Sequence, residues 1–116
     1  MAITTSRLKG IGAEPKYVGW GTGTTPPAAS NTALQTPAVE ARANGTTTQE
    51  TTNSLNDTYQ VNCTIVCAGT AKAITEVATF DAATGGNMDV RATFSPINIS
   101  VGDSINFTIK SVYDQA

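Results

Sequence analysis

Few residues in this chain of 116 residues could carry out chemistry, since it has no histidine, two cysteines and nine acidic residues. Without histidine, the commonest general base and the usual catalytic triad are excluded, and a cysteine nucleophile has no imidazole to activate it. The nine acids are dispersed along the chain and form no cluster in the sequence. We therefore expect no catalytic residues and no enzymatic activity.

One acidic residue has an unusual position. Glu76 stands in the middle of an apolar segment, residues 72–80. If buried, its carboxyl group could have a raised pKa and act as an acid or a base. The structural alternative, which we favour, is that Glu76 faces outward at a sheet edge or pairs with a nearby cation such as Arg91.

The two cysteines, Cys63 and Cys67, lie in a segment that alternates between apolar and polar residues. In an extended strand, a rise of about 3.3 Å per residue puts their Cα atoms roughly 13 Å apart. A disulfide needs less than about 7 Å. We therefore expect both thiols to be reduced, buried and inert. A metal pair is the functional alternative, but it lacks further ligands, so we expect neither a metal nor another cofactor.

Two other patterns have a functional and a structural interpretation. Gly19–Gly23 is similar to a glycine-rich phosphate loop, but Pro26 and Pro27 follow it where the phosphate motif requires a helix. Its glycines more simply let the backbone bend around Trp20. Aromatic side chains could also stack on sugars, although in a small β domain they usually fill the core. The candidates for stacking are Tyr17, Trp20, Tyr59 and Tyr113.

The elements that must position these residues are all predicted to be strands. Strict alternation over residues 58–67 indicates a half-buried strand, and similar alternation follows at 72–80, 88–94 and 104–112. We expect Pro96 to break the hydrogen-bond ladder after the third of these. The fold prediction is an all-β, antiparallel two-sheet sandwich, jelly-roll-like. Its core is expected to bring together Phe80, Phe94, Ile105, Phe107 and Ile109.

The first half of the chain gives weaker signals. Residues 17–21 predict a short strand, and residues 38–52 predict two weak strands around Asn44-Gly45, a dipeptide typical of type I′ hairpins. Residues 1–16 show no periodicity and are interpreted as an extended N-terminal arm, followed by a single β-sandwich domain at 17–116. The prolines of residues 22–37 exclude a helix interior or a central strand there.

The arm and the 22–37 loop have nothing evident to fold against within the domain. We expect both to contact partner chains, although a solvated tail is the simpler interpretation of the arm's basic residues. The candidate partner contacts are Arg7, Lys9, Lys16, Trp20, Thr24, Pro26 and Pro27.

Composition excludes several classes of partner. Charged residues make up 14% of the chain, against about 25% in an average soluble domain. The net charge of −2 and the scattered basic residues argue against a nucleic-acid partner. The first residues contain no apolar core of a secretory signal, and no stretch approaches the length of a membrane helix. We therefore expect synthesis in a host cytoplasm and no membrane partner.

Three stretches, taken together, resemble small virion proteins of tailed bacteriophages. YVGWGTGTTPPAASNTAL (17–34) resembles the "GTGTT-P-x-x-x-TAL" opening of those proteins. Residues 73–96 and 97–110 resemble their later strand–loop–strand and "GDS" turn. Trp20 departs from the pattern, which commonly has a smaller aliphatic residue there, and so do the two cysteines. The resemblance implies a structural role in head decoration, at the head–tail junction, or in tail and fibre attachment, and it carries no catalytic residues.

From this resemblance we expect a capsid decoration or cement protein that bridges neighbouring coat subunits at the capsid surface of the virion. Its partners would be the major capsid protein and further copies of itself, with a trimer as one arrangement. A tail adaptor or fibre-base protein is the first alternative. A carbohydrate-binding module for host attachment is the second.

Overall fold

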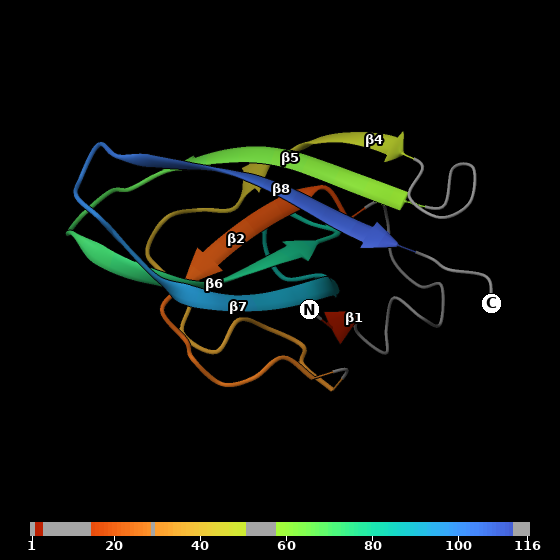
Figure 1. Ribbon diagram of the computed structural model, residues 1–116, viewed down its shortest axis with the longest axis horizontal. Coiled ribbons are helices and arrows are strands. Elements are labelled where there is room, and N and C mark those ends of the chain that lie inside the picture. The colour runs from red at the N-terminus through yellow and green to blue at the C-terminus, as the bar shows by residue number, and fades with distance from the viewer. Residues whose placement is uncertain (1, 4–14, 29, 51–57, 113–116) are drawn as a thin grey trace.

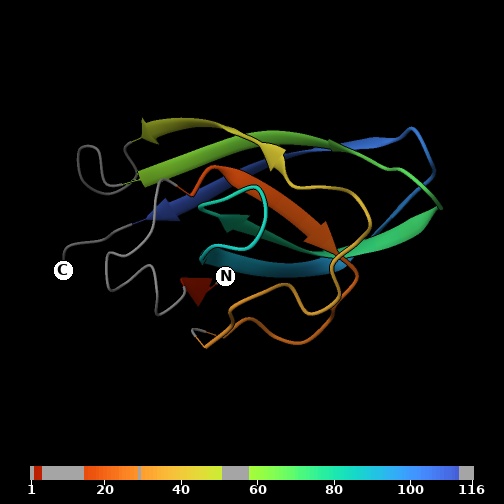
Figure 2. The same ribbon diagram turned by 180° about the vertical axis from the view of Figure 1, so that it is seen from behind.

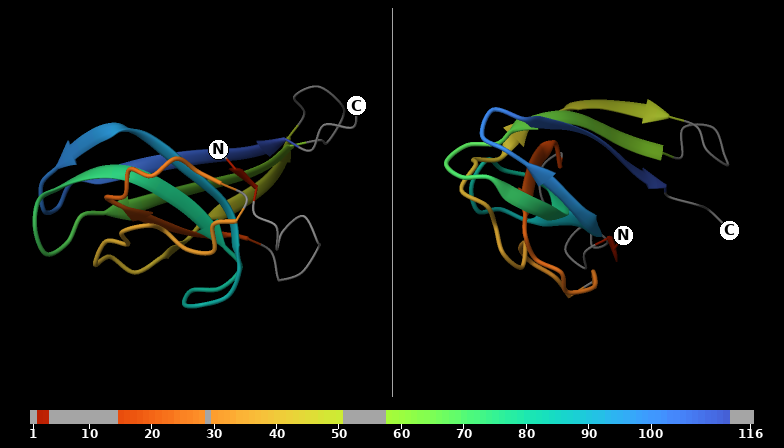
Figure 3. Two further views of the ribbon diagram at one scale, coloured as in Figure 1. Left: turned by 90° about the horizontal axis from the view of Figure 1, so that it is seen from below. Right: turned by 60° about the vertical axis from the view of Figure 1, so that its left-hand side comes forward.

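A computed structural model describes residues 2–3, 15–28, 30–50 and 58–112 of the chain, and all regular elements in these ranges are strands (Figure 1). No helix within them is long and apolar enough to cross a membrane. Two antiparallel sheets face each other as the layers of a sandwich (Figure 3), which confirms the predicted fold class. The strands are β1 (Ala2–Ile3), β2 (Tyr17–Gly21), β3 (Ala43–Asn44), β4 (Thr46–Glu50), β5 (Thr58–Val66), β6 (Lys72–Phe80), β7 (Met88–Ile99) and β8 (Ser104–Val112).

The two sheets differ in width. The larger has the strand order β1-β7-β6-β2-β3, and the smaller has the order β4-β5-β8. The main core lies between them and includes Val18 and Trp20 from β2 and Ile109 from β8. The edge of the Trp20 ring meets Phe107, with ring centroids 6.2 Å apart and an angle of 81° between the ring planes.

Strand β5 has the predicted alternation. Val61, Cys63 and Ile65 are buried, whereas Asn62 and Thr64 between them are exposed. Cys67, just beyond the strand, is buried as well, and both cysteines are free thiols. The expectation of inward-facing cysteines without a disulfide between them is therefore confirmed.

Strand β6 departs from the expected pattern of one apolar and one polar face, because all residues from Ile74 to Phe80 are buried. A register shift lies between Ile74 and Glu76, where residues 94–96 of β7 stand opposite Thr75 alone, and Ile74 joins Val77 in the main core. Phe80 lies in a second cluster with Leu34, Ala78 and Met88. The prediction that Phe80 meets the other aromatic residues was wrong, since β6 is a central strand with packing on both faces.

Strand β7 continues through Pro96 and does not end before it. Glu76 pairs with Thr93 and Ile74 pairs with Ile97, so Pro96 falls within the irregular part of the ladder. Proline is tolerated at such a bulge because no ladder hydrogen bond is required from its nitrogen. The ladder is therefore broken at Pro96 as expected, but the prediction that the strand ends at residue 94 was wrong.

The predicted hairpin at Asn44-Gly45 was also wrong. Strand β3 pairs with β2, whereas β4 pairs with β5 in the other sheet, so the chain changes sheets at Gly45. The Gly45 N–H donates to the carbonyl oxygen of Lys16 at 2.7 Å. A Cβ atom on Gly45 would lie 2.5 Å from Cγ1 of Val61. Glycine is required here for close packing and not for a hairpin turn.

We predict that Trp20→Ala lowers the free energy of unfolding by about 3–5 kcal/mol, because it empties the centre of the core and removes the contact with Phe107. Urea unfolding followed by circular dichroism measures the change. Val39 is 76% exposed, so Val39→Ala serves as the control and should shift stability by less than about 0.5 kcal/mol. Equal midpoints for the two variants would contradict the placement of Trp20.

Candidate functional site

Glu76, on the outer face of the five-stranded sheet, accepts four hydrogen bonds. The segment between β2 and β3 runs over this face (Figures 1 and 2). Glu76 is fully buried, and its Oε1 lies 2.9 Å from Nε of Arg91, which is also buried. The favoured interpretation of Glu76, a structural pairing with Arg91, is confirmed.

The same carboxylate binds both ends of the 22–37 loop. It accepts hydrogen bonds from the backbone N–H groups of Gly23 at 2.9 Å, Gln35 at 2.9 Å and Thr36 at 2.8 Å. Burial by itself would raise the pKa of Glu76, but these bonds and Arg91 outweigh burial and hold its pKa below the ordinary value. The carboxylate is therefore ionised and saturated with donors.

Arg91 extends the anchor further into the loop. Its Nη1 donates to the carbonyl oxygen of Thr25 at 2.9 Å and to Oδ1 of Asn31 at 3.4 Å. Thr75, beside Glu76 on β6, donates its hydroxyl to the carbonyl oxygen of Gly23 at 2.7 Å. The loop thus folds against the domain itself, and the expectation that it has nothing internal to fold against was wrong.

The glycines of the 19–23 motif let the backbone come close to the Glu76 carboxylate and to Thr36. A Cβ atom on Gly21 would lie 2.6 Å from Oε2 of Glu76 and 2.3 Å from the carbonyl oxygen of Thr36. One on Gly23 would lie 2.5 Å from the same Oε2. The backbone must come this near to donate to the carboxylate, so the motif binds an internal anion where a phosphate loop would bind an external one.

A second polar centre lies at Glu40, after the loop. Its carboxylate accepts hydrogen bonds from Nε1 of Trp20 at 2.9 Å and from the backbone N–H of Ala68 at 2.7 Å, and it pairs with Lys72. Burial acts to raise its pKa, but the bonds from Ala68, Lys72 and Trp20 outweigh burial and lower the pKa to about 2. Glu40 thereby connects the core tryptophan to the start of β6.

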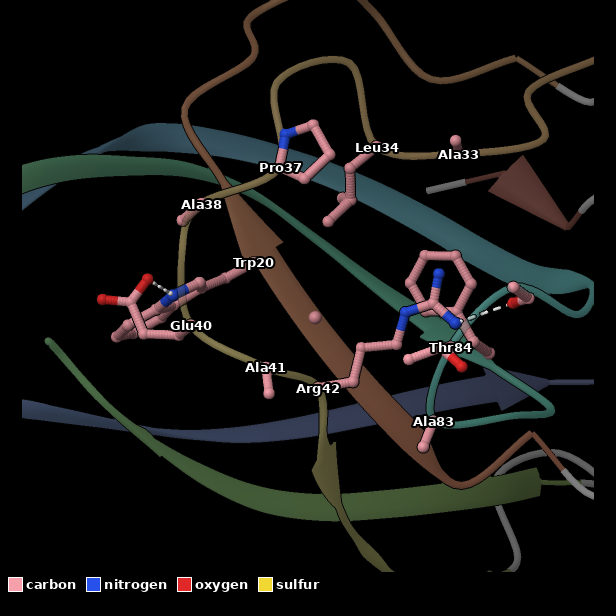
Figure 4. Close-up of a pocket in the computed structure, with 13 residues that line it drawn as sticks. Trp20, Ala33, Leu34, Pro37, Ala38, Glu40, Ala41, Arg42, Ala83 and Thr84 are labelled. Atoms are coloured by element: carbon pink, nitrogen blue, oxygen red, sulfur yellow. Dashed lines mark hydrogen bonds between the residues drawn. The ribbon is translucent and has the colours of Figure 1, made fainter.

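Between these elements is a hollow of about 280 Å³ (Figure 4), and Gly19 is one of the residues that line it. Leu34 and Pro37 line one side, and Arg42 lies on another, stacked over the Phe80 ring at 3.4 Å from its centroid. Arg42 also donates to the carbonyl oxygens of Ala82 at 2.9 Å and Gly85 at 2.8 Å. Burial lowers the pKa of Arg42, despite the opposing charge of Asp81. Arg42 thus holds the loop between β6 and β7.

This arrangement positions loops and offers little acid–base chemistry. A general acid at neutral pH needs a raised pKa, whereas both carboxylates have lowered values and are filled by donors. Among the described residues, no three cysteine or acidic side chains gather where they could hold a metal ion.

The residues predicted from sequence as partner contacts are dispersed. Arg7 and Lys9 lie outside the described residues. Lys16 is half-buried, with Nζ 5.8 Å from the centroid of the Tyr17 ring. Trp20 is 2% exposed and is not available to a partner. On the loop, Thr24 and Pro26 are exposed and Pro27 is half-buried, so these three stay predicted contacts.

The candidate sugar platform is not assembled. Trp20 is in the core, Tyr17 packs on the second cluster and Tyr59 on the first, while Tyr113 lies outside the described residues. Sequence reasoning missed the roles of Glu40 and Arg42. Their only signal was the placement of two opposite charges two residues apart in a chain with few charges.

We predict that Glu76→Gln lowers the free energy of unfolding by about 3–5 kcal/mol, because Arg91 keeps a buried charge and one amide oxygen replaces two carboxylate oxygens. Residues 24–33 should also become sensitive to limited proteolysis. In the double variant Glu76→Gln/Arg91→Gln, the loss should be smaller than the sum of the two single losses. Additive losses would show that the pair does not act as a unit.

We predict that Glu40 makes stability depend on acid. Because its pKa is lowered from 4.5 to about 2 on folding, its contribution is complete above about pH 4.5 and is lost as the pH falls towards 2. The wild-type protein should therefore lose more stability than Glu40→Gln between pH 5 and pH 2.5, as measured by urea unfolding. Parallel pH profiles would contradict this role.

Comparison with known proteins gives one result for nearly the whole chain. A family model described as "Podophage GP4 fiber I protein gp80" matches residues 5–113. No curated protein and no solved structure matches the chain.

Proposed function

Because this chain belongs to the podophage GP4 fiber I protein gp80 family and is therefore a structural protein of a phage particle, we propose that it is a non-enzymatic subunit of the tail fibre or of its base. The observation that carries the proposal is the extent of the family match, which includes every sheet-forming strand from β2 to β8.

The chemistry of the site supports a structural role. Glu76 and Glu40 are used to fix the 22–37 loop and the start of β6, so neither carboxylate is left to act on a substrate. Arg91, Arg42 and Lys72 hold the same segments from the cationic side. A subunit that only transmits and resists force at contacts needs rigid loops of this kind.

The outer face of the three-stranded sheet is also suited to contacts with other proteins of the particle. The side-chain amides of Asn62 and Asn106 bond to each other at 3.3 and 3.2 Å. Asn62 also donates to the Thr108 hydroxyl at 2.9 Å, and Asn106 donates to that of Thr64 at 2.7 Å. Uncharged amides and hydroxyls at a protein surface form many modest hydrogen bonds with little desolvation of charge.

Capsid decoration was the expectation from sequence, but the family is one of fibre proteins, which favours the tail alternative. We therefore keep fibre or fibre base as the proposed location. Decoration becomes one of the outcomes of the experiment that tests it.

We predict that the protein occurs in purified phage particles at about a dozen copies or a small multiple of that number, as tail symmetry dictates. Quantitative mass spectrometry against the major capsid protein gives the copy number, and antibody labelling in electron micrographs gives the position. Hundreds of copies distributed over the head would overturn the fibre proposal and restore capsid decoration.

A further inference from the structure

The three-stranded sheet ends at β8, and the five-stranded sheet extends beyond it. Strand β8 pairs with β5 along its whole length, and none of the described residues pairs with its other edge. Phe107 of β8 contacts Trp20 of β2, so the larger sheet continues past β8 with β7 and β1. In Figure 1, β7 and β8 form the near side of the sandwich, and in Figure 2 they form the far side.

An apolar groove of about 520 Å³ follows this open edge. Its floor is the inner face of β7, and its wall is the edge of β8 from Ile105 to Lys110. Two aromatic rings meet inside it, since the centroids of Phe94 and Phe107 are 6.2 Å apart. Ile97, which also lines the groove, is 41% exposed. The groove therefore contains core-type residues that no strand covers in the described part of the chain.

Over residues 104–109, the open edge lacks the features that protect natural edge strands. Exposed edges usually carry charges, proline or bulges that prevent pairing with another chain. Residues 104–109 (SINFTI) contain no charge, proline or glycine, and Lys110 stands at one end of the groove. A segment of this composition is a strong template for strand pairing. We therefore expect a partner to cover this unprotected edge.

The shape of the edge selects one kind of partner. A complete sandwich domain has two layers. If such a domain paired with the edge of β8, its second layer would clash with β7, which extends beyond β8. In particular, a second copy cannot bring its own β8 against this β8, because its β7 overhangs in the same way. A single extended segment fits, since it needs one layer beside β8 and beneath β7.

On the side of the molecule where the groove lies, one short strand, β1, already pairs with the edge of the larger sheet. Strand β1 pairs antiparallel with β7 at Val90 and Arg91, although it is only two residues long. The groove lies further along β7, at Ala92, Phe94 and Ile97. A segment added to β8 would thus continue a side of the molecule where short strands already join the sheets.

We propose that the groove between β7 and β8 is a strand-acceptor site for an extended segment of another polypeptide. The segment pairs with the edge of β8 that no described strand covers and completes a fourth strand of the smaller sheet. Every second side chain is apolar and packs against Phe94 and Phe107. The intervening side chains are uncharged, apart from an acidic one beside Lys110. Main-chain hydrogen bonds supply the affinity, so the site requires alternation and not one particular sequence.

Because alternation is what the site requires, the sequence of β8 itself is a suitable probe. A fluorescent peptide with the sequence of residues 104–112 should bind the full-length protein saturably, as measured by fluorescence anisotropy. In hydrogen exchange, it should protect the backbone amides of β8 and leave those of the opposite edge strand, β4, unchanged. The same peptide with Ile105→Ser, Phe107→Ser and Ile109→Ser should not bind.

Two matched variants of the protein locate the binding. Ile97→Lys puts a charge into the groove and should weaken binding by about tenfold or more, the loss that removal of a central interface contact produces. Val101 is 58% exposed and does not line the groove, so Val101→Lys should bind like the wild type. Both variants should keep the wild-type melting temperature, because both replace exposed side chains.

Three results would overturn the proposal: no saturable binding of the peptide, equal binding to Ile97→Lys and wild type, or protection of β4 in place of β8. The test uses free protein in solution and does not depend on where the chain is placed in the particle. It can therefore fail while the fibre proposal stands, and the reverse also holds.

Discussion

The buried carboxylate of Glu76 is the group on which the outer half of this domain depends. It brings together Arg91 from the neighbouring strand and three backbone N–H groups from both ends of a long loop. A buried ion pair alone contributes little net stability, because desolvation of the charges offsets their attraction. Here the main role of the pair is to fix the path of the 22–37 loop across the sheet, because that loop contains no strand of its own.

The few charges of the chain are used in the same way elsewhere. Glu40 and Lys72 connect the chain that follows the loop to the start of β6, and Arg42 holds the turn before β7. Natural domains usually place charged side chains on the surface, whereas here these side chains bind and fix loop segments. Threonine is the commonest exposed residue in the described part of the chain. The same few charged residues therefore fix the loops and leave little charge on the surface.

Sequence reasoning predicted the features that depend on local alternation. Strands β5 and β8 each have one buried and one exposed face, so a period of two was sufficient to find them. It failed at β6 and β7, where bulges near Thr75 and Pro96 shift the pattern, and at Gly45, where tertiary packing required the glycine. The pairing of Glu76 with Arg91 could be foreseen from an acid placed among apolar residues. The three backbone donors to Glu76 could not, because amide groups leave no trace in the sequence.

The separation of the anchoring groups along the chain has a consequence for how the domain folds. Gly23 and the carboxylate that it binds are 53 residues apart, and Arg91 is 66 residues from Thr25. The loop cannot find its path until β6 and β7 have been synthesised and paired, because only that hairpin brings Glu76 and Arg91 together. Contacts so distant in sequence form late and slow the folding of β proteins. The outer layer of this domain is therefore completed last, on a scaffold that the C-terminal half supplies.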